Sequence, residues 1–291
     1  MNTTIEEQVE TKIIHFMNDA MAKSIFRSKE LRTTVSKFLS GVTHIPSNVI
    51  ARSVFMGGEI PKRNMEEKGK TSDVIIKVSE DTYIIVEFNR SYAKHLFEKN
   101  ATYAYSILLS KIHPKPVFYP KIILVNIDNF NSFSRKEPIL KFESLDHHTS
   151  EHKLYTSYHV ILANITNTNY NIDKEVRKFG TLLKENLTIE ELVEKYEGDE
   201  EYMKIINKTK ELIADEDFAI YYDIDEAHES DKQDAYETGY DSGYGSGYDN
   251  GQSKGKQEER LAIAKNLLDL NFSVQDIMKA TKLNQKDIMN L

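Results

Sequence analysis

Apolar side chains alternate between two sides of the chain in two neighbouring stretches, residues 73–79 and 82–89. In the first stretch Val74, Ile76 and Val78 share one side, and in the second stretch Ile84, Val86 and Phe88 share one side. The opposite side is also largely apolar, which is typical of strands covered on both faces of a sheet. The polar residues 79–82 predict a turn, so the two stretches form a β-hairpin.

Two carboxylates interrupt this apolar hairpin, Asp73 and Glu87. Burying an unpaired carboxylate costs several kcal/mol or raises its pKa until it is neutral, so the pair suggests a shared cation. If Val78 lies opposite Tyr83, the carboxylates fall on opposite faces, whereas an odd loop or a β-bulge places them together. We predict the odd loop or bulge. Two other interpretations stay open: Asp73 as a strand-entry cap, and Glu87 in a buried ion pair with a lysine such as Lys77.

With these residues the chain resembles the PD-(D/E)XK nuclease superfamily, and within it the Rpn-type recombination-promoting nuclease/putative transposase branch. GKTSD (69–73) and VEFN (86–89) resemble the metal-binding strands of that branch. Residues 18–41 and 99–110 are similar to its helices, residues 120–127 and 157–165 to its later core strands, and residues 257–291 to its C-terminal helices. The resemblance covers most of the chain and implies an α/β fold, a mixed sheet flanked by helices with a C-terminal helical extension.

The resemblance also implies a site. In the family an Asp and a Glu hold a metal ion, usually Mg²⁺, and a third residue, commonly Lys or in this branch Gln, positions the attacking water. These positions correspond here to Asp73 and Glu87 as ligands of Mg²⁺ or Mn²⁺, and to Asn89. Asparagine orients a water but supplies no charge to the phosphorane. A displaced cation would compensate, and the candidates are Lys77, Lys94 and Lys99. Asp19 matches an acid in the branch's first helical motif and is taken as an accessory acid.

The composition of the chain limits the class of protein to which it can belong. The chain has 291 residues, of which 40% are hydrophobic and 29% charged, and this is typical of one or two globular domains. It has no cysteine, which excludes disulfides and a cysteine nucleophile and fits the cytoplasm. Residues 1–12 lack the features of a signal peptide, and no apolar run reaches the roughly 20 residues of a membrane span.

Charge is distributed unevenly along the chain. The net charge is -8, and acidic residues concentrate between Glu197 and Glu237. A basic groove that binds DNA phosphates near the hairpin is therefore compatible with the sequence, although a solvated lysine-rich surface is the alternative. The groove would use Lys62, Arg63, Lys68, Lys70, Arg90 and Lys94.

Glycine recurs at every fourth position from Gly239 to Gly255, with tyrosines between. Glycine costs a helix about 1 kcal/mol per residue, so we interpret residues 236–256 as a linker, with a helix that pairs with a second copy as the alternative. Beyond it, residues 257–291 predict three helices, with Ser273 capping the second and Asn284 beginning the third. The predicted organisation is a nuclease-like core (1–165), a helical extension (166–235), the linker and a helical tail.

These observations favour a metal-dependent DNA endonuclease. The alternative is a catalytically inactive relative that binds DNA or protein, because Asn89 departs from the usual motif. Expected partners are DNA and, through the C-terminal segments, a second copy of the chain; no membrane partner is expected.

Overall fold

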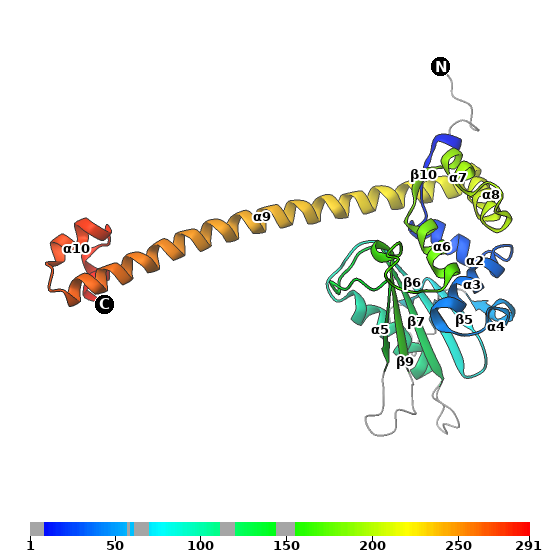
Figure 1. Cartoon of the computed structure of the whole chain (residues 1–291), viewed down its shortest axis with the longest axis horizontal. Helices are drawn as coiled ribbons and strands as arrows, with labels where there is room; N and C mark the ends of the chain where they lie inside the picture. The colour runs from blue at the N-terminus through cyan, green and yellow to red at the C-terminus, as the bar shows by residue number, and fades with distance from the viewer. Residues whose placement is uncertain (1–8, 57–58, 61–69, 111–119, 144–154) are drawn as a thin grey trace, which may run out of the picture. The chain divides into compact units, whose positions relative to one another are not determined.

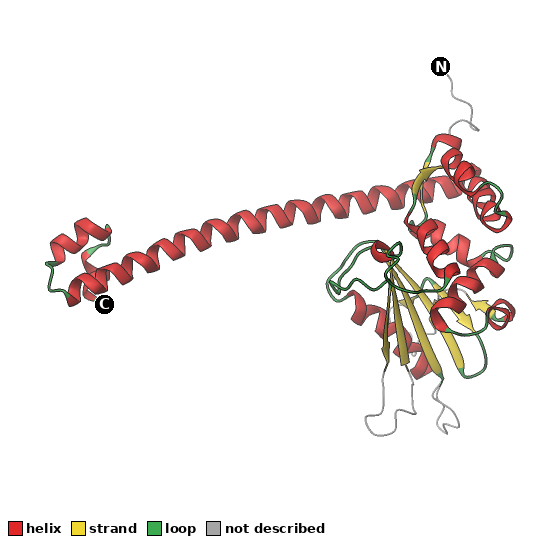
Figure 2. Ribbon diagram, in the orientation of Figure 1, coloured by secondary structure: helices red, strands yellow, loops and turns green. Residues whose placement is uncertain are grey.

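The structure is a computed structural model that describes residues 9–56, 59–60, 70–110, 120–143 and 155–291 (Figure 1). Its chain divides into two compact units, Met1–Glu229 and Ser230–Leu291. The first unit is a mixed α/β structure whose six-stranded sheet is flanked by helices (Figure 2). The prediction of a mixed sheet flanked by helices is therefore confirmed.

The six strands lie in the order β2-β5-β6-β7-β9-β8. They are β2 (Val54–Met56), β5 (Val74–Lys77), β6 (Thr82–Asn89), β7 (Lys121–Asp128), β8 (Ile139–Glu143) and β9 (Tyr155–Ile161). β6, β7 and β9 run parallel, whereas β2 pairs with β5, β5 with β6, and β8 with β9 in antiparallel fashion. A parallel pair requires a crossover, and α5 (Leu96–Ser110) provides it between β6 and β7. Two short pairs complete the strands: β1 (Ile13–His15) with β10 (Asn186–Thr188), and β3 (Glu59–Ile60) with β4 (Lys70–Thr71).

Each face of the sheet buries its own apolar cluster. Val74, Ile84 and Val86 belong to the larger cluster. The unit also contains α2 (Asp19–Arg27), α3 (Arg32–Thr43), α4 (Ser47–Arg52), the short 3₁₀ helix η1 (Leu162–Asn164), α6 (Lys174–Lys184), α7 (Ile189–Tyr196), α8 (Glu200–Ala214) and the start of α9 (Glu216–Asp269). The other face packs Ile85 and Leu124 against α5. This two-sided burial explains why the central strands are apolar at nearly every position.

The compact unit that contains the sheet continues beyond residue 165, where the predicted core ends, as far as Glu229. Val176 and Phe179 of α6 and Tyr222 of α9 lie in the same buried cluster as Val35. Because these side chains cover one face of the sheet, the segment that follows residue 165 belongs to the first unit as far as Glu229.

The Gly/Tyr segment is helical in the structure. Residues 236–256 lie within α9 (Glu216–Asp269), so the linker interpretation is wrong about secondary structure. Glycine lowers helix stability but keeps its N–H donor, and the sequence has no proline after Pro138 that would remove one. The two helices that follow are α10 (Val274–Thr281), capped by Ser273 as predicted, and α11 (Gln285–Met289), capped by Asn284. No helix in the described ranges combines the length and the apolarity that a membrane span requires.

Candidate active site

The β5–β6 hairpin brings Asp73 and Glu87 to the same face of the sheet. Val74 pairs with Val86 across the antiparallel ladder, so positions 73 and 87 form the next facing pair. Lys77 pairs with Tyr83, and the Val78 N–H donates to the Thr82 carbonyl, so three residues, Ser79–Asp81, lie between the facing positions 78 and 82, an odd number. Facing residues of an antiparallel pair project to one side. The predicted odd loop is therefore confirmed.

Glu87 lies at the carboxyl end of β6 and is only 5% exposed. Its carboxylate accepts hydrogen bonds from the Ser72 hydroxyl and from the backbone N–H of Asp73. Burial, and then the neighbouring negative charge of Asp73, raise the pKa of Glu87 to about 8, against an opposing effect of Lys99. A carboxyl group with this pKa holds a proton at neutral pH unless a cation lies beside it.

Asp73 lies at the start of β5, between the hairpin and α2. Its Oδ2 accepts a hydrogen bond from the backbone N–H of Phe88 (2.8 Å), and its Oδ1 lies 3.1 Å from Nζ of Lys23. Burial raises the pKa of Asp73, while Lys23 and the Phe88 N–H oppose that rise. Nζ of Lys23 also lies 2.6 Å from Oδ2 of Asp19. Lys23 therefore joins the predicted accessory acid to the predicted metal ligand.

The position of Lys23 depends on how α2 begins. The buried side chain of Asn18 caps the helix by accepting hydrogen bonds from the N–H groups of Ala20 and Met21. A fixed first turn places Asp19 and Lys23 one turn apart on the same helix face. Lys23 was not among the residues predicted from the sequence, although its spacing of four residues from Asp19 predicts a pair on one helix face.

The donor atoms at Asp73 and Glu87 fit a hard divalent cation. Carboxylate and backbone carbonyl oxygens are the ligands that Mg²⁺ prefers, together with water. Among the residues that the structure describes, no group of three or more His, Cys, Asp or Glu side chains surrounds a point where a metal would bind. The pKa of Glu87 is high partly because Asp73 is negative, and a divalent cation would balance that charge.

Lys77 lies far from this pair. It is at the opposite end of β5 from Asp73, and its Nζ lies 2.7 Å from the carboxylate of Glu80 in the turn. Alternation along β5 correctly predicted that Lys77 shares a face of the sheet with Asp73, but Lys77 lies at the other end of the strand. The structure therefore contradicts both its predicted role in the site and the proposed ion pair between Lys77 and Glu87.

Asn89 lies two residues after Glu87 on the same face of β6 and is buried. Its amide belongs to a closed ring of hydrogen-bonded side chains, in which all six residues are buried: Asn89, Asn100, Asn126, Asp128, Ser157 and His159. The sequence analysis selected only Asn89 from this ring. The sequence does contain a pattern that predicts the other members on β7 and β9: polar residues stand at alternate positions in two apolar runs. These are Asn126 and Asp128 in one run, and Ser157 and His159 in the other.

The ring continues the row of polar side chains that begins at Glu87. Across the parallel strands, Glu87 pairs with Asn126, and Asn126 pairs with His159. The same face is apolar earlier along the strands, at Ile85 and Leu124. The change from apolar to polar therefore occurs at the carboxyl ends of the parallel strands, where open α/β sheets bind their ligands.

The predicted basic groove is only partly described. Lys62, Arg63 and Lys68 lie outside the described residues. The guanidinium of Arg90 pairs with the carboxylate of Glu226 on α9, with Nη1 2.7 Å from Oε1, and lies 3.7 Å from Asp225. Because Arg90 is already neutralised by α9, it does not contribute the free positive charge expected of it.

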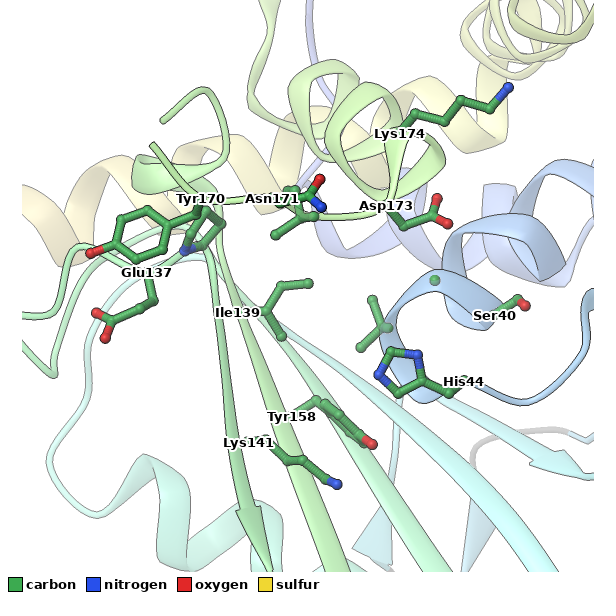
Figure 3. Close-up of a pocket in the computed structure, with 14 residues that line it drawn as sticks. Ser40, His44, Glu137, Ile139, Lys141, Tyr158, Tyr170, Asn171, Asp173 and Lys174 are labelled. Atoms are coloured by element: carbon green, nitrogen blue, oxygen red, sulfur yellow. The ribbon is translucent and has the colours of Figure 1, made fainter. Parts of the chain in front are cut away.

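A separate pocket of about 930 Å³ lies on the other face of the sheet, between α3, α6 and the β8–β9 edge (Figure 3). Its apolar wall includes Ile139 and Ile172, and its rim carries both Lys141 and Asp173. No residue of the carboxylate pair or of the polar ring lines it. The pocket and the candidate active site are therefore different features.

Comparison with known proteins adds no relative: no family model, no curated protein and no solved structure matches this chain. The residues at the carboxyl ends of β6, β7 and β9 therefore carry the chemistry from which a function can be inferred.

Proposed function

We propose that this protein is a metal-dependent DNA endonuclease whose core is similar to the PD-(D/E)XK fold of Rpn-type nucleases. The observation that carries the proposal is the facing pair of the half-buried Asp73 and the buried Glu87, in which the pKa of Glu87 rises to about 8. A protein gains nothing in stability from such a pair, so a cation-binding role accounts for it. We place the activity in the cytoplasm, in keeping with a chain that has no cysteine.

Each residue has a separate task in this proposal. Asp73 and Glu87 hold Mg²⁺ or Mn²⁺, which when bound positions a water and neutralises charge on the scissile phosphate. Lys23 lies 3.1 Å from Asp73 and supplies the positive charge that Asn89 lacks. Asp19 holds the ammonium group of Lys23 in place through its 2.6 Å ion pair.

The test is cleavage of plasmid DNA by the purified chain with Mg²⁺ or Mn²⁺, beside Asp73→Ala and Glu87→Ala. Glu80→Ala is the matched control, because it removes an exposed carboxylate from the turn of the same hairpin. We expect cleavage by the native protein and by Glu80→Ala, and a loss of 100-fold or more in the two site variants, roughly the effect of removing the charge stabilisation of a transition state. Equal cleavage by all four proteins would refute the proposal.

One observation favours a second candidate, a catalytically inactive nuclease-like module that binds DNA. The amide of Asn89 is committed to a hydrogen-bond ring instead of carrying a charge toward the metal ligands. Salt-dependent DNA binding without cleavage in either metal ion would support this candidate and exclude the enzyme.

A further inference from the structure

The ring of buried polar side chains has one consistent pattern of donors and acceptors. With Asp128 as a carboxylate, which only accepts, the pattern can be assigned. Its Oδ1 accepts from the amide nitrogen of Asn89 (2.7 Å), and its Oδ2 lies 2.8 Å from Nδ1 of His159. Nδ1 of His159 is therefore the donor, and Nε2 is left to accept.

The remaining contacts agree with this assignment. Nε2 of His159 lies 3.3 Å from the hydroxyl of Ser157, which donates to it. Ser157 accepts in turn from the amide nitrogen of Asn126 (3.1 Å). Asn100 closes the ring by donating to Oδ1 of Asn89 (3.0 Å) and to Oδ1 of Asn126 (2.9 Å). The side-chain amide of Asn89 consequently has one orientation, nitrogen toward Asp128 and oxygen toward Asn100.

His159 and Asp128 do not reach a substrate. His159 is enclosed by the rings of Phe97, Phe133 and Phe142, whose centroids lie 4.8, 4.9 and 5.5 Å from its own. Both residues are buried, and Asp128 is only 1% exposed. Although Ser157, His159 and Asp128 are joined in the order of a nucleophile, a base and an orienting acid, an enclosed imidazole has no access to an acyl group.

We propose that Asp128 and His159 are positioning residues of the nuclease site, which act by holding the amide of Asn89 in one orientation beside Glu87. This inference rests on the proposed function. The negative charge of Asp128 strengthens its bond to the amide nitrogen and makes the amide oxygen a better acceptor for a water near the metal ligands. His159 fixes the second oxygen of Asp128, so the carboxylate cannot rotate away from Asn89.

The test is a double-mutant cycle on the full chain. Single-turnover DNA cleavage and Mg²⁺ affinity are measured for Asp128→Asn, His159→Phe, Asn89→Ala and the double variant Asn89→Ala/Asp128→Asn. Loss of an orienting partner of this kind typically costs about 10- to 100-fold in activity. We expect that loss in each single variant, an Mg²⁺ affinity unchanged within about threefold, and no further loss in the double variant relative to Asn89→Ala.

Thr156→Val is the matched control. Thr156 is buried on β9, the strand of Ser157 and His159, and its side chain lies on the opposite face of the sheet from theirs. It should cleave within about twofold of the native protein, since the hydroxyl that is lost takes no part in the hydrogen bonds of the ring. The side-chain amide resonances of Asn89, followed by NMR, should shift in His159→Phe and in Asp128→Asn but not in Thr156→Val.

The outcomes separate the two proposals. Additive losses in the cycle, unmoved Asn89 resonances, or a parallel fall in Mg²⁺ affinity would overturn the positioning role while leaving a nuclease that depends on Glu87. A native protein that cuts no DNA in either metal ion would overturn both. Should His159→Phe fail to fold, the nearly isosteric Asp128→Asn and its cycle with Asn89→Ala still decide the matter.

Discussion

The carboxyl group of Glu87 should destabilise the metal-free protein at neutral pH, and Glu87→Gln should remove that effect. Burial and Asp73 raise the pKa of Glu87 from 4.5 to about 8. Because the folded-state pKa lies above the unfolded-state value, the folded protein binds the proton more tightly. Stability is unaffected below pH 4.5, falls as the pH rises toward 8, and stays low above that pH.

The size of the effect follows from the two pKa values. Each tenfold change in a proton equilibrium is worth about 1.4 kcal/mol, so the loss reaches about 3 kcal/mol at pH 7 and about 5 kcal/mol well above pH 8. Gln replaces one carboxylate oxygen by an NH₂ group, which adds a donor beside the Ser72 hydroxyl and the Asp73 N–H that both donate to Glu87. The cost of that added donor, about 1 kcal/mol, does not depend on pH and cancels when two pH values are compared.

The assay is urea unfolding of the native protein and Glu87→Gln at pH 5 and pH 8.5, with a chelator present. Between these values the free energy of unfolding of the variant relative to the native protein should rise by about 4 kcal/mol. Mg²⁺ at pH 8.5 should stabilise the native protein and leave the variant unchanged, since the variant lacks a ligand. Glu80→Gln, whose carboxylate is 93% exposed, should shift by less than about 0.5 kcal/mol.

An equal difference between native protein and Glu87→Gln at both pH values would refute this reasoning, because Glu87 would then ionise as it does in the unfolded chain. Stabilisation of the variant by Mg²⁺ equal to that of the native protein would refute the assignment of Glu87 as a ligand.

Three further predictions concern other residues. Lys23→Met removes the cation beside Asp73, so calorimetric titration at pH 8 should show Mg²⁺ binding about tenfold tighter while cleavage falls; weaker Mg²⁺ binding would contradict this assignment of charge. Gly41→Ala places a methyl group 2.5 Å from Cγ2 of Val176 on α6, so urea unfolding should show a free energy of unfolding lower by about 1–3 kcal/mol. An unchanged free energy of unfolding would mean that α3 and α6 separate easily. Asn89→Lys should not increase cleavage, because the new ammonium lies where the Asn89 amide meets Asp128 and pairs with that carboxylate; a plasmid assay that shows faster cutting would disprove this placement.

Much of the sheet could be predicted from local pattern. Alternation over residues 73–79 and 82–89 determined which side chains share a face, and the need to bring two buried carboxylates together indicated the odd loop. The extent of the helices was harder to predict. The low helix propensity of glycine favoured a linker at residues 236–256, where the structure has a continuous helix. Intrinsic preferences are weak, so they did not determine the state of that segment.

The site was predictable only in part, because its missing members come from distant segments. Lys23 reaches Asp73 from a helix 50 residues earlier, and nothing in the hairpin sequence indicates that approach. Asp128 and His159 meet because β7 and β9 are parallel neighbours, a pairing that fixes which end of each strand carries the site. The prediction for Lys77 failed for a different reason. Alternation along one strand shows which face of the sheet a side chain lies on, but the end of the sheet that carries a site depends on how all the strands are arranged.

The position of Asp128 gives a physical reason for asparagine at position 89. A lysine at position 89 would extend into a buried region where a carboxylate already lies, and pairing there would withdraw its charge from the metal ligands. An amide instead bonds to Asp128 without using a formal charge. The positive side chain of the proposed site comes instead from α2, where Lys23 forms ion pairs with both Asp73 and Asp19. In the proposed site, Asn89 beside Asp128 and Lys23 beside Asp73 are therefore two parts of one arrangement of charge, in which the ring orients and the helix supplies the positive group.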